Sequence, residues 1–116
     1  MLLFHDDRCE TEALSDEARG ALFAEFVAWA DNLAAAGRYE HSEALMPNAE
    51  ARTLRKRGET LSIDGPFAES QEAVNGFVTI NAASLDDAAT IAAECPSLRL
   101  GWAVEIRELR EIQKPD

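Results

Sequence analysis

The sequence has little cysteine, no long hydrophobic run and few basic residues. Its two cysteines, Cys9 and Cys95, lie far apart and fit no CxxC or metal-ligand spacing. We interpret them as free thiols in a reducing compartment, with a disulfide between them as the alternative. No apolar run approaches the roughly 20 residues that span a bilayer, and the apolar start MLLF is too short for a signal peptide. We therefore expect a cytoplasmic protein without a membrane segment.

The shortage of positive charge excludes one class of partner. There are 22 acidic and 11 basic residues, for a formal net charge of −11. Affinity for nucleic acid comes mainly from Lys and Arg that neutralise phosphates, so we expect no nucleic-acid partner. The basic run RTLRKR at 52–57 is short and interleaved with other residues, and we interpret it as a solvated strand and turn.

With 116 residues, the chain predicts a single domain over 1–116. MLLFHD predicts a strand with Leu2 and Phe4 on one face and Leu3 and His5 on the other. Helical spacing of apolar residues then predicts a helix over 16–36, with Ser15 as N-cap and Gly37 as the left-handed residue after its end. The apolar stripe of this helix contains Ala18, Leu22, Phe23, Phe26, Val27, Ala30, Leu33 and Ala34.

The rest of the chain alternates between strands and one further helix. Turn signals at MPN and KRGE separate strands at 39–46, 51–56 and 60–63, the last two forming a hairpin. GFVTINA, residues 76–82, is a β-branched and aromatic strand. SLDDAATIAAECP, residues 84–96, is a helix with a capping box from Ser84 to Asp87. WAVEIREL, residues 102–109, contains a half-buried strand.

This order of elements predicts an α+β fold of the ferredoxin-like, split βαβ type with an extra hairpin. Such a domain places both helices on one face of an antiparallel sheet, and the other face needs a cover. We expect a second copy of the chain to supply it, which makes the protein a homodimer.

Strand alternation predicts a site on the helix-free face. If two such faces meet, they enclose a mixed polar and aromatic cavity, the usual kind of small-molecule site. Glu105 and Arg107 form either a structural ion pair there or a pair whose Arg holds a substrate carboxylate. The predicted lining consists of Phe77, Thr79, Asn81, Glu105 and Arg107.

The loop DGPFAES, residues 64–70, carries the other candidate chemistry. Its Gly-Pro pair makes a turn, and Asp64 either accepts backbone hydrogen bonds within that turn or serves as the acid of a pocket. His41 or His5 could meet Asp64 as a general-base pair, although Asp6 and Asp7 indicate that His5 is solvated. Without such a pair, the acid/base candidates are Asp64, Glu69 and Glu105. The sequence contains no Ser-His-Asp order, metal cluster or phosphate-binding glycine loop, so we expect no metal and no cofactor.

The chain resembles the YCII-related, DGPF-domain family of small bacterial proteins. The resemblance rests on DGPFAESQE, the following GF, then LDDA, CP and VEIR, and it extends from MLLF through Arg107. The family implies a ferredoxin-like domain dimerised as a dimeric α+β barrel. This chain departs from the family's usual pattern at Gln71, where the family has Lys, and at Glu108, where it has Pro. A role that needs a cation at position 71 is therefore lost. The motif positions that carry over are Asp64, Gly65, Pro66, Phe67, Glu69, Glu72, Gly76, Glu105 and Arg107.

The resemblance leaves function open between classes. Related YCII proteins carry a His and an Asp proposed as a catalytic pair, and DGPF-type members are often encoded beside extracytoplasmic-function sigma factors. The first hypothesis is a ligand-sensing or regulatory homodimer with a small-molecule cavity and a link to a sigma factor by family analogy. The alternative is a small-molecule enzyme of the isomerase, lyase or hydrolase type, with Asp64 and His41 as catalytic residues and Phe67, Glu69, Phe77, Glu105 and Arg107 as substrate-binding residues. In a third interpretation the motif only shapes the dimer.

Overall fold

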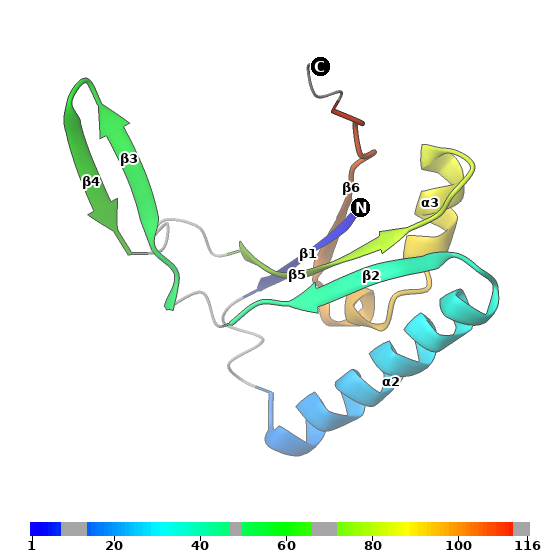
Figure 1. The fold of residues 1–116 in the computed structure, drawn as a ribbon. Helices are drawn as coiled ribbons and strands as arrows, with labels where there is room; N and C mark the ends of the chain where they lie inside the picture. The colour runs from blue at the N-terminus through cyan, green and yellow to red at the C-terminus, as the bar shows by residue number, and fades with distance from the viewer. Residues whose placement is uncertain (8–13, 47–49, 66–71, 113–116) are drawn as a thin grey trace.

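A computed structural model describes residues 1–7, 14–46, 50–65 and 72–112 (Figure 1). The predictions for Cys9, Phe67, Glu69 and Gln71 lie outside these residues. The elements are β1 (Leu2–Asp7), α2 (Asp16–Ala35), β2 (Tyr39–Ala44), β3 (Thr53–Arg57), β4 (Thr60–Asp64), β5 (Glu72–Ile80), α3 (Leu85–Ala92), the 3₁₀ helix η2 (Pro96–Leu100) and β6 (Ala103–Ile106).

Four strands form one antiparallel sheet in the order β2-β5-β1-β6. Helices α2 and α3 both lie on one side of it (Figure 1). Strands β3 and β4 pair with each other as a separate two-stranded sheet. The predicted α+β, ferredoxin-like fold with an extra hairpin is therefore confirmed.

Helix α2 begins and ends where its capping residues predict. The Ser15 hydroxyl accepts the Ala18 amide at 3.1 Å, and Gly37 takes a positive φ of 74° just beyond the end. Although α2 is 20 residues long, no helix in the described ranges combines the length and the apolarity needed to cross a membrane.

The predicted stripe on α2 is partly wrong. Phe23 and Val27 are 69% and 39% exposed, whereas Trp29, which the stripe omitted, is 7% exposed and belongs to the core. A helix on one side of a sheet buries a limited sector of its circumference. Because α2 carries apolar residues nearly all round, the sequence pattern does not single out that sector.

The core lies between the sheet and the two helices. The Phe4 ring meets Phe26 and Trp29 edge-on, with centroids 5.4 and 6.3 Å apart. Cys95 is buried as a free thiol, in agreement with its predicted state. The buried cluster consists of Leu2, Phe4, Trp29, Leu33, Val78, Ala92 and Cys95.

Helix α3 has the predicted cap, with one difference. The Ser84 hydroxyl accepts the Asp87 amide at 3.0 Å, but the Asp87 carboxylate accepts the amide of Ala83, not that of Ser84. The helix predicted over 84–96 ends earlier, at Ala92, and the chain then forms η2, which was not predicted. Pro96 is the first residue of η2, in agreement with the tolerance for Pro in the first turn of a helix.

Candidate functional site

The candidate site lies on the side of the four-stranded sheet that faces away from α2 and α3, which we call the open face. Alternation along β1 buries Leu2 and Phe4 against the helices and turns Leu3 and His5 to this face. Leu3 is opposite Phe77 of β5 and opposite Glu105 of β6. The open face consists of Leu3, His5, His41, Glu43, Val74, Phe77, Thr79, Ala103 and Glu105.

A histidine-carboxylate pair is the most developed polar feature of the open face. His5 Nε2 and Glu105 Oε1 are 2.9 Å apart and hydrogen-bonded, and their side chains are 23% and 44% exposed. The antiparallel register of β1 and β6 places Glu105 opposite Leu3 and His5 opposite Ala103, so His5 and Glu105 are diagonal neighbours on the same face. An imidazole oriented by a carboxylate can act as a general base, and it can also hydrogen-bond a ligand.

His5 was not predicted as the partner of Glu105. The signal was present, since alternation already placed His5 and Glu105 on the same side of their strands. The two aspartates after His5 suggested a solvated side chain, but Asp6 is only 9% exposed and lies on the other face of the strand. What the sequence could not supply was the pairing of β1 with β6, strands separated by almost the whole chain.

The predicted ion pair between Glu105 and Arg107 is present. Arg107 Nη1 lies 3.8 Å from Glu105 Oε2, with the Arg side chain 69% exposed. One carboxylate thus interacts with His5 through one oxygen and with Arg107 through the other. The guanidinium is already partly neutralised, which makes it a weaker receptor for a ligand carboxylate.

A second histidine-carboxylate pair lies on β2. His41 Nε2 is 3.2 Å from Glu43 Oε1, and the His41 ring lies 5.9 Å from the Phe77 ring with an interplanar angle of 54°. Two predicted site residues, His41 and Phe77, are therefore in contact. Because β5 separates β2 from β1, this pair and the His5–Glu105 pair are distinct groups on the same face.

Asp64 does not lie on the open face of the four-stranded sheet. It is the last residue of β4, opposite Thr53, and its side chain is exposed. Among the described residues, no hydrogen bond or ion pair joins Asp64 to His5, His41, Glu105 or Arg107. The structure does not bring together the predicted pair of Asp64 and His41, and its catalytic role stays a prediction.

Asn81 is a correction to the predicted lining. It follows β5, and its backbone amide donates to the Arg38 carbonyl at 2.7 Å. Its side-chain amide lies 3.5 Å from the Gly37 carbonyl. Strand alternation does not extend past Ile80, so Asn81 ties down the turn after α2 and does not join the open face. Within the described ranges, no three His, Cys, Asp or Glu side chains are grouped in a way that could hold a metal ion.

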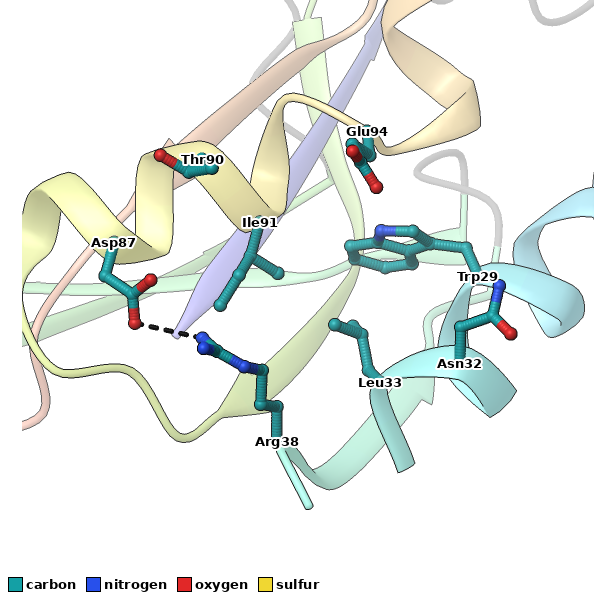
Figure 2. Close-up of a pocket in the computed structure, with 8 residues that line it drawn as sticks. All are labelled: Trp29, Asn32, Leu33, Arg38, Asp87, Thr90, Ile91 and Glu94. Carbon is teal, nitrogen blue, oxygen red and sulfur yellow. Dashed lines mark hydrogen bonds and ion pairs between the residues drawn. The ribbon is translucent and has the colours of Figure 1, made fainter. Parts of the chain in front are cut away.

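A groove of about 310 Å³ lies on the opposite side of the molecule, between α2 and α3 (Figure 2). Arg38 Nη1 and Asp87 Oδ2 form a 3.0 Å ion pair across it. The Ala83 amide and then Arg38 hold the pKa of Asp87 below its ordinary value. These groups interact with one another and fasten α3 to the turn after α2, so we assign the groove a structural role. Its lining consists of Trp29, Asn32, Leu33, Arg38, Asp87, Thr90, Ile91 and Glu94.

Comparisons with known proteins identify the family. The family model described as the YCII-related domain matches residues 1–113. The chain is also similar to an uncharacterized protein of Rhizobium meliloti strain 1021, with 38% identity over 88 residues that cover 75% of this chain and 71% of the relative. The match extends over nearly the whole chain and agrees with the α+β fold. The chain therefore belongs to the YCII-related domain family.

Proposed function

We propose that the protein is a homodimer that binds a small molecule on the open face and serves as a ligand-sensing or regulatory protein. The observation that carries the proposal is the 2.9 Å hydrogen bond between His5 and Glu105 on a sheet face that lies away from both helices. A site with a few oriented polar groups among apolar side chains is the usual form of a small-molecule pocket.

The dimer is supported by the composition of the open face. Leu3 and Phe77 are partly buried, and Val74 beside them is 37% exposed, so apolar surface lies between the two histidine-carboxylate pairs. A sheet with helices on one side only leaves such a surface in water until something covers it. A second copy offers the same face, and a two-fold contact between the faces would enclose the polar groups.

The charges of the open face support a particular ligand class. Glu43 and Glu105 both contribute carboxylates, and the nearby Arg107 is already paired with Glu105. An anionic ligand would meet net repulsion, whereas a neutral or cationic one would not. The Phe77 ring beside His41 offers a surface for an aromatic or aliphatic body. We infer a neutral or cationic compound with an apolar body.

The same geometry favours an enzyme as the second candidate. His5 and Glu105 have the arrangement of a general base with its orienting carboxylate. An isomerase, lyase or hydrolase reaction that begins with proton removal would then use His5. In that case His5→Asn abolishes turnover while binding persists, whereas a sensor loses only affinity.

Three aromatic probes of similar size test the proposal: benzylamine, benzyl alcohol and benzoate. We expect the first two to shift the amide NMR signals of Leu3, Phe77 and Glu105, and benzoate to shift them least. Glu105→Gln should weaken the response to benzylamine, while Glu94→Gln, in the groove between the helices, should leave it unchanged. Shifts confined to residues of that groove would contradict the proposal, as would equal responses to benzoate and benzylamine.

A further inference from the structure

The β3–β4 hairpin has one apolar face that the described residues leave uncovered. Its register pairs Leu54 with Ile63 and Lys56 with Leu61, which places these four side chains on the same face. Leu54, Leu61 and Ile63 are 59%, 57% and 62% exposed. The residues between them, including Arg55, Arg57 and Ser62, form a polar opposite face.

A two-stranded hairpin with an exposed apolar face has little stability in water. A two-stranded hairpin is marginal by itself and needs packing against another element. Here the hairpin stands apart from the four-stranded sheet (Figure 1). The radius of gyration is 16.6 Å, whereas a compact chain of this length has about 13 Å. The apolar face therefore needs a cover that the described residues of the same copy do not provide.

The charges near the apolar face of the hairpin indicate what kind of surface packs against it. Four of the 11 basic residues lie within 52–57, but Arg55 and Arg57 belong to the polar face, so Lys56 supplies the positive charge on the apolar face. An acidic surface with an apolar centre complements such a hairpin. The open face has this character, because Leu3 and Phe77 lie between the carboxylates of Glu43 and Glu105. A nucleic acid or an anionic membrane would instead be repelled by the net charge of −11.

We propose that the hairpin is an arm that packs Leu54, Leu61 and Ile63 on the open face of a second copy. There it brings Lys56 next to the partner's carboxylates. The inference rests on the proposed homodimer and deepens it, since the hairpin of one copy then forms one wall of the ligand cavity on the other and adds Lys56 to it.

Two neighbouring positions give a matched test of the arm. Leu61→Asp introduces a carboxylate on the apolar face, and Ser62→Asp introduces the same carboxylate one residue away on the polar face. We expect Leu61→Asp to raise the dimer dissociation constant at least tenfold in sedimentation equilibrium, and Ser62→Asp to change it less than twofold. Equal effects of the two variants would overturn the proposal.

Nuclear Overhauser effects in the unmodified protein keep the proposal testable if Leu61→Asp fails to fold. A mixture of isotope-labelled and unlabelled copies reports only contacts between copies. Contacts from the Leu61 and Ile63 methyl groups of one copy to the Phe77 ring of the other are expected. A dimer whose open faces contact each other without these hairpin contacts would overturn the arm and leave the homodimer standing. A dimer with the hairpin contacts but no probe response at Glu105 would retain the arm and overturn the ligand site.

Discussion

The two faces of the four-stranded sheet differ although the same strands make both. Toward the helices, Leu2, Phe4 and Val78 are 0%, 4% and 0% exposed and lie in the aromatic core. On the open face, His5 and Glu105 are only partly covered and interact with each other. One face thus supplies most of the folding energy, while the other can carry polar groups that contribute little to it.

The largest loss of stability is expected on the side of the sheet that packs against α2 and α3, which we call the closed face. Phe4→Ala removes a ring that packs on Phe26 and Trp29, and it should lower the free energy of unfolding by about 3–5 kcal/mol. Urea denaturation at a fixed protein concentration measures this. Phe23→Ala is the control, because Phe23 is 69% exposed on α2 and its loss should cost less than about 0.5 kcal/mol. Similar losses for both would contradict the assigned core.

The second largest effect concerns Gly76, a residue of the family motif that lies in β5 opposite Phe4. A Cβ atom there would come within 2.8 Å of the Glu43 carbonyl oxygen in the neighbouring strand. Gly76→Ala should therefore separate β2 from β5 locally and cost about 1–3 kcal/mol. Gly20→Ala is the matched control. Nothing lies within 4 Å of the new methyl group on α2, so helix propensity should add about 0.5–1 kcal/mol of stability. A neutral Gly76→Ala would refute the close strand contact.

A third change separates stability from binding. His5→Asn breaks the hydrogen bond to Glu105 on the open face, and the free energy of unfolding should change by only about 0–1 kcal/mol. The amide shifts induced by benzylamine should decrease strongly in the same variant. A loss as large as that of Phe4→Ala would mean that the open face is part of the core and that the contrast between the faces is wrong.

The smallest effect is a pH dependence at the rim of the closed face. The Ala83 amide and Arg38 lower the pKa of Asp87 from its ordinary value of 3.8. The ionised carboxylate thus contributes stability above pH 3.8, and this contribution is lost as the pH falls through the lowered folded value. Thermal unfolding should show Asp87→Asn as less stable than the native protein at pH 7, with the difference shrinking below pH 4. A constant difference would show that charge is not the cause.

Local signals predicted most of the elements. Ser15 and Gly37 marked both ends of α2, and Ser84 marked the start of α3, because capping groups lie within a few residues of the backbone groups they satisfy. The turn at Gly58, with a φ of 61°, closed the predicted hairpin. The predicted start of β5 was late by four residues, since GFVTINA begins at 76 and the strand begins at Glu72.

The candidate site was predictable in outline only. Alternation along single strands assigned Phe77 and Glu105 to the face away from the helices, and the Glu105–Arg107 pair was anticipated from its spacing. Asp64 and His41 were predicted as a pair because a carboxylate and an imidazole often act together, without evidence that they lie close in space. The structure places them on different sheets. The partner of Glu105 is His5, because β1 pairs with β6.

By itself, the sequence determined the order of elements, the helix caps, the hairpin and the two faces of each strand, because all of these depend on neighbours a few residues apart. Only the tertiary structure decided which sector of α2 is buried, that His5 meets Glu105 across 100 residues, and that the hairpin leaves its apolar face exposed. These features depend on pairing between distant segments, which local propensity and periodicity do not encode.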